Sequence, residues 1–158
     1  YMTKTQKKTA DFMEGCMELG GLLGDWHESE IIELKKYGHA LGMAFQITDD
    51  IMDYRETAET TGKPVGNDLR EGLLTYPLLS IVNDDNKDKL LEDIKGLNNG
   101  GNEQDIIDYV IAQGGIDNTL AVADQYCKDA LAALDAVRDF PGTEFLVMAV
   151  ENLADRKV

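Results

Sequence analysis

The segment EIIELKKYGHALGMAFQITDDIMDY, residues 30 to 54, decides the fold of this 158-residue chain. It contains no proline, and its helical pattern continues without a break from end to end. Ser29 comes directly before it, and serine is a favoured residue at the N-cap of a helix. The segment therefore predicts one long, largely buried helix.

Four polar side chains of this segment share one face of the predicted helix. Gln46, Asp49, Asp50 and Asp53 stand at i, i+3, i+4 and i+7, which places them on adjacent turns. Carboxylates so close together repel one another, and they are costly in an otherwise apolar helix unless a cation binds them. Hard oxygen ligands of this kind suit Mg²⁺, which commonly bridges one or two carboxylates to substrate phosphates. The alternative is that a DDxxD pattern arose by chance in an acidic chain.

A second DDxxD pattern, at Asp84, Asp85 and Asp88, provides a comparison within the same chain. It lies in a polar turn beside Lys87 and Lys89 and has no apolar flank. Short charged runs of this type are usually solvated surface. We therefore expect the second pattern to carry no function.

The rest of the sequence also predicts helices. Helical spacing of apolar or small residues predicts a buried stripe on a helix through residues 9 to 23, ending at Gly24. Glycines, a proline and cap-forming residues predict an ordered loop over residues 60 to 68. An apolar run (73–82), a polar turn (83–88), a flexible connection (98–102) and helices near 106–111, 120–134 and 145–153 follow. Strict alternation is missing, so the predicted fold class is all-α.

The composition excludes several classes of function. The 30 acidic residues outnumber the 15 basic ones and give a formal net charge of −15, which disfavours nucleic acid and anionic membrane surfaces as partners. A phosphorylated substrate would need divalent cations to neutralise it. Cys16 and Cys127 form no disulfide or zinc pattern, and no apolar stretch approaches the length of a membrane span. We expect a soluble protein in a reducing, cytoplasmic setting.

The residues around the first DDxxD resemble a known family. Phe45 and Gln46 precede it, the run 62–69 (GKPVGNDL) follows, and residues 71–77 (EGLLTYP) come next. This order resembles the second aspartate-rich motif of the trans-isoprenyl diphosphate synthases, the polyprenyl synthetase family, written FQxxDDxxD and GKPxGxDLxEGxxTxP. Lys8-Thr9 resembles the Lys-Thr pair that precedes this motif in the family.

The resemblance spans essentially the whole chain and implies a fold. Residues 1–158 would be the C-terminal half of an isoprenoid synthase helical bundle, part of a single polyprenyl synthase domain. Nothing before Lys8 matches the family's first aspartate-rich motif, which belongs to the N-terminal half. The stripe on residues 9–23 and the apolar parts of residues 40–52 would then face helices that this chain lacks.

The family resemblance also implies roles for individual residues. Asp49 would coordinate Mg²⁺ that bridges to the allylic diphosphate, with Asp50 and Asp53 as direct or water-mediated support. Lys8 and Lys63 would contact diphosphate oxygens. The oxygens of Thr9 and Gln46 would stabilise the allylic cation. Together, the predicted site has seven residues: Lys8, Thr9, Gln46, Asp49, Asp50, Asp53 and Lys63.

Each role has a simpler alternative. Lys8 and Lys63 could be solvated surface charges, and Gln46 could be a polar residue whose hydrogen bonds are made within the helix. The sequence also departs from the family pattern, because Leu73 stands where many members carry a lysine that contacts phosphate.

The implied activity is condensation of isopentenyl diphosphate with an allylic diphosphate to give an all-trans polyprenyl diphosphate. A homodimer is expected, and the chain alone is expected to be inactive because it holds one of the two aspartate-rich motifs. A terpene cyclase is disfavoured by Lys8-Thr9 and by Gly62-Lys63-Pro64. The remaining alternative is a non-catalytic helical regulatory or interaction subunit derived from this family.

Overall fold

A computed structural model describes residues 1–55, 66–97 and 99–156 of the chain. These residues form helices and turns, and no strand occurs among them. The chain divides into two compact units, one of Met2–Thr48 with Leu120–Val158 and one of Tyr1 with Asp49–Thr119. The predicted all-α class is confirmed.

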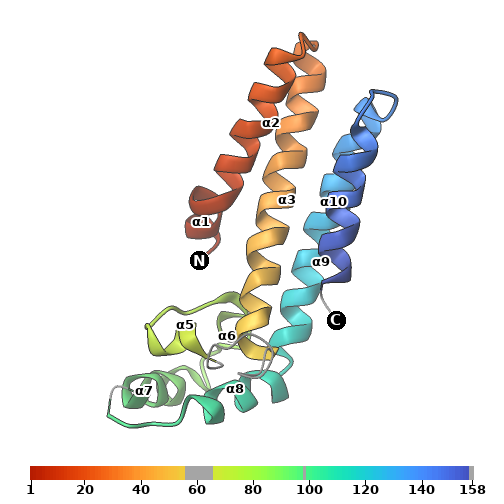
Figure 1. The fold of residues 1–158 in the computed structure, drawn as a ribbon. Helices are drawn as coiled ribbons and strands as arrows, with labels where there is room; N and C mark the ends of the chain where they lie inside the picture. The colour runs from red at the N-terminus through yellow and green to blue at the C-terminus, as the bar shows by residue number, and fades with distance from the viewer. Residues whose placement is uncertain (56–65, 98, 157–158) are drawn as a thin grey trace. The chain divides into compact units, whose positions relative to one another are not determined.

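Figure 1 shows the helices of the described residues. In chain order they are α1 (Met2–Thr5), the π-helix η1 (Gln6–Ala10), α2 (Asp11–Leu23), α3 (Glu28–Arg55), α5 (Asn67–Arg70), α6 (Tyr76–Leu79), α7 (Lys87–Leu97), α8 (Glu103–Ala112), α9 (Gly115–Ala133), the 3₁₀-helix η2 (Leu134–Val137) and α10 (Thr143–Asp155).

The long helix predicted for residues 30 to 54 is confirmed as α3. It begins two residues before Glu30, because the Glu30 carboxylate turns back and accepts a hydrogen bond from the backbone N–H of His27 at 2.8 Å. An acidic side chain that satisfies a free N–H at a helix start in this way is typical of a capping arrangement. Ser29, the predicted N-cap, therefore lies inside the first turn.

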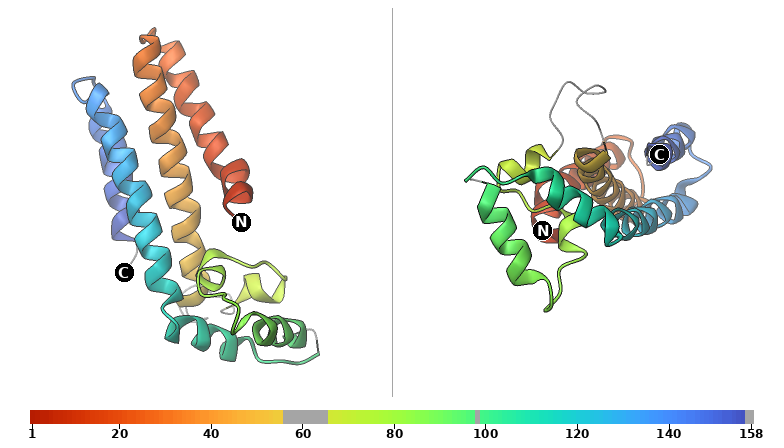
Figure 2. Two further views of the ribbon diagram at one scale, coloured as in Figure 1. Left: turned by 180° about the vertical axis from the view of Figure 1, so that it is seen from behind. Right: turned by 90° about the horizontal axis from the view of Figure 1, so that it is seen from below.

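The unit of Met2–Thr48 and Leu120–Val158 is a bundle of long helices. Within it, α2 lies along α3, and α10 lies along α9 (Figures 1 and 2). Its core joins side chains of α3, α9, η2 and α10: Leu34, Tyr37, Ala40, Ala44, Cys127, Ala130, Ala133, Leu134, Val137, Val150 and Leu153. The Tyr37 hydroxyl donates to the Leu146 carbonyl at 3.0 Å, and burial raises the pKa of Tyr37 to about 12.

Two glycines let α3 approach the N-terminal helices closely. A Cβ at Gly38 would lie 2.7 Å from the Met13 carbonyl oxygen, and one at Gly42 would lie 2.6 Å from the Ala10 Cα. Real side chains do not fit at these distances, so both positions require glycine. The two contacts fix how α2 and η1 are aligned along α3.

The unit of Tyr1 and Asp49–Thr119 contains short helices around a small apolar core. Leu69, Leu78, Ile107 and Val110 are almost fully buried there. The apolar run predicted over residues 73–82 forms only the four-residue helix α6, with a proline in its first turn. That unit also holds the predicted polar turn, which is shorter than the predicted range 83–88 because α7 begins at Lys87, and residues 99–102 of the predicted connection, which lie outside the helices α7 and α8.

The structure bears on two predictions of burial. On α2, Met13 and Met17 are half-buried, but Cys16 is exposed and Leu23 is 87% exposed, so the stripe is not buried along its length, as expected if it faces helices that this chain lacks. The same expectation for residues 40–52 is wrong, because Ala40, Met43, Ala44, Ile47 and Ile51 are at most 5% exposed and the chain itself covers them. Periodicity identifies residues that share a face, but it does not identify what covers that face.

No helix among the described residues is long and apolar enough to cross a membrane.

Candidate active site

The three carboxylates of the first DDxxD lie on the last two turns of α3, in three different environments. Asp49 is exposed to solvent, whereas Asp50 is only 5% exposed. The Tyr1 hydroxyl donates a hydrogen bond to Asp50 Oδ2 at 2.5 Å. A buried carboxylate held this way has a fixed orientation.

Asp53 binds the backbone that enters the short helix α5. Its two carboxylate oxygens accept hydrogen bonds from the backbone N–H groups of Asn67 (3.1 Å) and Asp68 (3.2 Å). Its carbonyl oxygen accepts a third from the N–H of Gly66 at 3.1 Å. Each carboxylate oxygen has a second lone pair, so these bonds leave Asp53 able to hold a cation as well.

Tyr54, next to Asp53 on α3, is buried and stays neutral. Its pKa is raised to about 12, chiefly by burial; the hydrogen bond with the Thr75 hydroxyl lowers it, and the charges of Asp53, Asp50 and Asp68 add to the rise. That hydroxyl donates to the Tyr54 oxygen at 3.4 Å. The Tyr54 hydroxyl therefore adds no negative charge next to Asp53.

Thr9 and Gln46 meet in the helical bundle. Thr9 Oγ1 donates to Gln46 Oε1 at 2.9 Å, which joins η1 to α3 across 37 positions of sequence. The contact depends on Gly42, one turn before Gln46, where the absence of a side chain admits Ala10. A π-helical turn such as η1 is rare and is frequently found at functional sites. Lys8, in the same turn, is exposed to solvent.

The structure thus places six of the seven residues predicted for the site. Thr9 contacts Gln46 directly, and Asp49, Asp50 and Asp53 share the end of α3. Lys63 and most of the predicted ordered loop lie outside the described residues. Leu73 is partly exposed, between α5 and α6.

Sequence reasoning missed two contributors to this region. Tyr1 orients Asp50, and the backbone of residues 66–68 binds Asp53. Backbone donors carry no signal in the sequence, because every residue except proline has one. A tyrosine 49 positions away from its partner likewise follows no helical spacing.

The second DDxxD has the surroundings that its composition predicts. The Asp84 side chain is 94% exposed and pairs with Lys87 at 2.7 Å. Asp85 and Asp88 are also exposed, the latter in the first turn of α7.

The sequence of residues 1–113 matches the family model described as "Polyprenyl synthetase". The chain belongs to this family. It is 31% identical over 137 residues to heptaprenyl diphosphate synthase component 2 of Geobacillus stearothermophilus, with 87% of this chain and 43% of that protein covered. It is 33% identical over 151 residues to the octaprenyl diphosphate synthase of Escherichia coli, with 93% and 46% covered.

Solved structures show the same likeness. The heptaprenyl diphosphate synthase of Staphylococcus aureus aligns with all of this chain and 50% of its own, at a TM-score of 0.88 and 28% identity. A polyprenyl synthase of Caulobacter crescentus, solved with calcium and isoprenyl diphosphate, aligns with 99% of this chain and 48% of its own, at a TM-score of 0.78 and 32% identity. The chain therefore spans about half the length of the relatives that it matches.

Proposed function

We propose that this chain is the C-terminal half of an all-trans polyprenyl diphosphate synthase and supplies one wall of its active site. The reaction is ionisation of an allylic diphosphate, attack by isopentenyl diphosphate and loss of a proton. The observation that carries the proposal is the environment of the three carboxylates on α3: one is exposed, one is buried and held by Tyr1, and one is bound to backbone.

The donor set fits magnesium. Carboxylate oxygens on adjacent helical turns are the hard ligands that Mg²⁺ prefers, and the ion commonly keeps waters and substrate phosphates in its remaining positions. The relative from Caulobacter, bound to calcium and isoprenyl diphosphate, supports a divalent cation next to a diphosphate. When bound, Mg²⁺ would neutralise the diphosphate as it leaves. Asp49, the exposed carboxylate, would be the first ligand, with Asp50 and Asp53 holding the arrangement.

The other predicted residues would act on substrate directly. Lys8 and Lys63 would bind diphosphate oxygens and stabilise the negative charge that develops on them. Gln46 Oε1 already accepts a hydrogen bond from Thr9, which fixes the amide oxygen in place. That oxygen and the Thr9 oxygen would lie beside the allylic cation and favour its positive charge.

The exposed apolar face of α2 supports a missing partner for this chain. Phe12 is 72% exposed, Leu19 60%, Leu22 59% and Leu23 87%. Apolar groups gathered on one helix are unfavourable in water, at about 25 cal/mol per Å². We propose that the half carrying the first aspartate-rich motif covers this face, and that the complete enzyme is a homodimer.

Radiolabelled isopentenyl diphosphate tests the proposal. The 158-residue chain, checked by intact mass, should transfer no label to an allylic diphosphate in the presence of Mg²⁺. Co-expression with the N-terminal half of the Escherichia coli relative should restore transfer. A complex that co-purifies but transfers nothing would contradict the proposal and favour a non-catalytic subunit, and transfer by the chain alone would contradict the half-enzyme assignment.

A further inference from the structure

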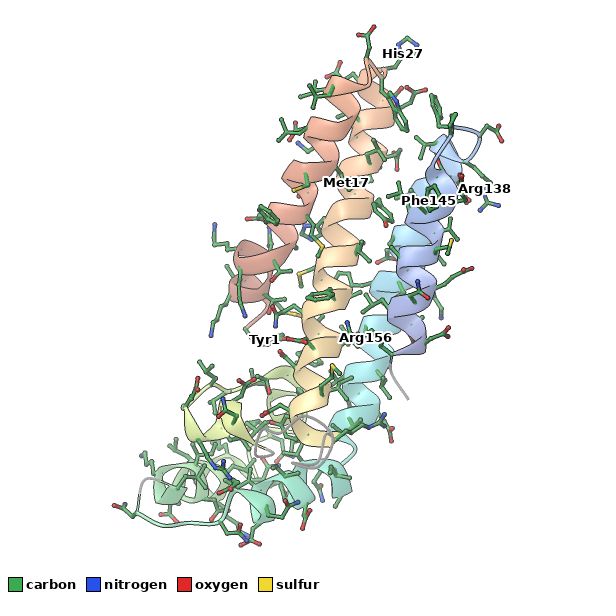
Figure 3. The ribbon with its side chains drawn as sticks, in the orientation of Figure 1. Tyr1, Met17, His27, Arg138, Phe145 and Arg156 are labelled. Atoms are coloured by element: carbon green, nitrogen blue, oxygen red, sulfur yellow. The ribbon has the colours of Figure 1, made fainter. Side chains whose placement is uncertain are left out.

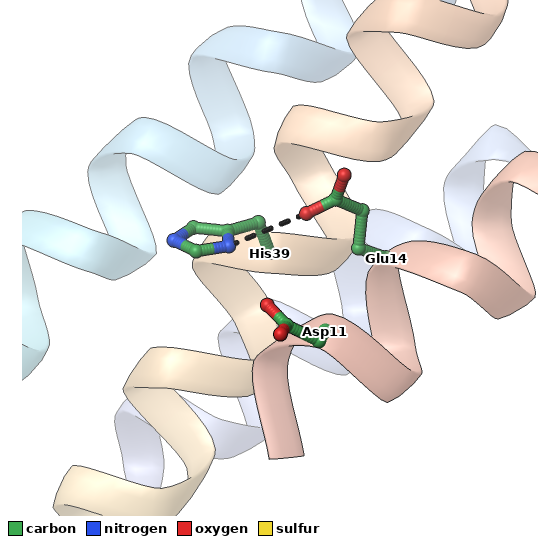
Figure 4. A group of neighbouring side chains, drawn as sticks. All are labelled: Asp11, Glu14 and His39. Carbon is green, nitrogen blue, oxygen red and sulfur yellow. Dashed lines mark ion pairs between the residues drawn. The ribbon is translucent and has the colours of Figure 1, made fainter. Parts of the chain in front are cut away.

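The helical bundle holds a group of side chains whose atoms could serve as metal ligands. Asp11 and Glu14 stand three residues apart on α2, and His39 stands on α3. One ligand atom from each lies within 4.8 Å of the other two. Figure 4 shows the three side chains pointing toward one another from the two helices.

We propose that Asp11, Glu14 and His39 form a binding site for a divalent transition metal ion such as Zn²⁺. The bound ion would link α2 to α3. One imidazole nitrogen and two carboxylate oxygens are a donor set that Zn²⁺ uses with a fourth position open. The inference goes beyond prenyl transfer and stands whether or not the chain serves that reaction.

The distances are near those that an ion would impose. Ligand atoms about 2.0–2.1 Å from a tetrahedral Zn²⁺ lie roughly 3.4 Å from each other. His39 Nδ1 and Glu14 Oε2 are already 3.5 Å apart. A ligand atom of Asp11 lies within 4.8 Å of the other two, and the Asp11 side chain is exposed to solvent.

The backbone holds the ligands in alignment. Gly38, next to His39, contacts the backbone at Met13, next to Glu14. Gly42, one turn on, contacts Ala10, next to Asp11. The tight packing of the two helices therefore occurs one residue away from each ligand, so that the pairing of the three side chains does not depend on flexible loops.

Lys35, the cation that would compete with a metal ion for Glu14, already has another partner. Lys35 lies 3.7 Å from Glu14 but 3.0 Å from Glu18, and the hydrogen bond to Glu18 is the main cause that raises the pKa of Lys35. An ion could therefore take Glu14 and leave Lys35 with Glu18.

The site is open on one side. The side chains of Glu14 and His39 are each about one third exposed, at 33% and 34%. Both line a groove of about 670 Å³ between α2, α3 and α9, whose wall also includes Tyr126 and Asp129. The fourth ligand of the ion would come from this groove, as a water molecule.

The chain offers an internal control, because His27 and His39 are its only histidines. His27 is exposed at the turn between α2 and α3 (Figure 3). Zn²⁺ titrated into the untagged, ¹⁵N-labelled chain should change the imidazole signals of His39 at a lower concentration than those of His27. Mg²⁺ at the same concentrations should leave both unchanged, since it prefers oxygen ligands.

Variants complete the test. His39→Gln and Asp11→Asn should each weaken Zn²⁺ binding in isothermal titration at least about 10-fold, since even the loss of an outer partner of a metal site costs that much. Asp117→Asn, an exposed acid on α9, should change it less than 2-fold, and Asp49→Asn should leave the His39 response intact. Equal responses from the two histidines, unchanged affinity in Asp11→Asn, or loss of the response in Asp49→Asn would overturn the site. Because Asp11 is exposed, Asp11→Asn should leave the chain folded. This variant therefore tests the site even if His39→Gln unfolds the chain.

Discussion

Two segments of this chain carry the same DDxxD pattern in opposite surroundings. Asp50 of the first is buried and bound by Tyr1, and Asp53 is bound by the backbone of residues 67 and 68. In the second, Asp84 is 94% exposed and its partner is a lysine three residues away. The pattern alone therefore does not define a site. What defines one is the set of groups that holds each carboxylate in place while one of them stays open to a ligand.

The largest expected difference between the two patterns is in turnover. In the complete synthase, Asp49→Ala should lower kcat at least about 10²-fold, as does removal of a preorganised charge-stabilising group. Asp84→Ala should change kcat less than 2-fold. Initial rates of isopentenyl transfer measure both. An equal loss of kcat in the two variants would mean that the two segments do not differ in function.

The next effect is on stability and concerns Asp53. Asp53→Ala removes a carboxylate that accepts two backbone hydrogen bonds, and should lower the free energy of unfolding by about 1.5–3 kcal/mol. The matched change in the second segment, Asp88→Ala, removes only a charge in the first turn of α7 and should cost under about 1 kcal/mol. Urea denaturation compares them, and the reverse order would mean that Asp53 does not fix the backbone.

A third effect tests the backbone that Asp53 binds. Gly66 has φ +76°, and an added Cβ would lie 2.9 Å from Ile107 Cδ1. Gly66→Ala should cost about 2 kcal/mol, because it adds a steric contact to the strain of a left-handed residue.

Gly72 provides the control for this change. It has φ +74° and nothing within 4 Å of an added Cβ, so Gly72→Ala carries the backbone strain alone and should cost about 1 kcal/mol. If the two variants unfold at the same urea concentration, the close contact at Gly66 contributes nothing to the change in the free energy of unfolding.

The smallest effect is in the second segment itself. Lys87→Ala breaks an exposed ion pair with Asp84 and should change the free energy of unfolding by less than about 0.5 kcal/mol. A loss above 1 kcal/mol in thermal denaturation would mean that the second segment is more ordered than its exposure indicates.

Sequence reasoning identified the elements better than their contacts. The 28-residue helix α3 was predictable because its pattern continues without proline through both the core and the carboxylates. The exposure of Leu23 was not, since helical spacing carries no information about which neighbour covers a face. The hydrogen bond from the Asn67 N–H to Asp53 joins residues 14 positions apart, and no helical spacing predicts such a pair.

The cluster of Asp11, Glu14 and His39 shows the same limit and one usable signal. Nothing in the spacing of three residues on two helices reveals that they meet. Gly38 and Gly42, four residues apart on α3, do indicate a close approach of another helix. Residues beside such a glycine pair are therefore the ones to examine for contacts between helices.

The most direct test of the central claim asks which of the two segments binds a metal with diphosphate. A 1:1 mixture of Mn²⁺ and inorganic diphosphate, added to the ¹⁵N-labelled chain, broadens the amide signals near the bound ion. We expect the signals of Asp49 to Asp53 to disappear before those of Asp84 to Asp88, with no change in Asp84→Asn and no early loss in Asp49→Asn. Earlier loss of the signals of Asp84 to Asp88, or equal loss in both segments, would contradict the assignment of metal and diphosphate binding to the first DDxxD.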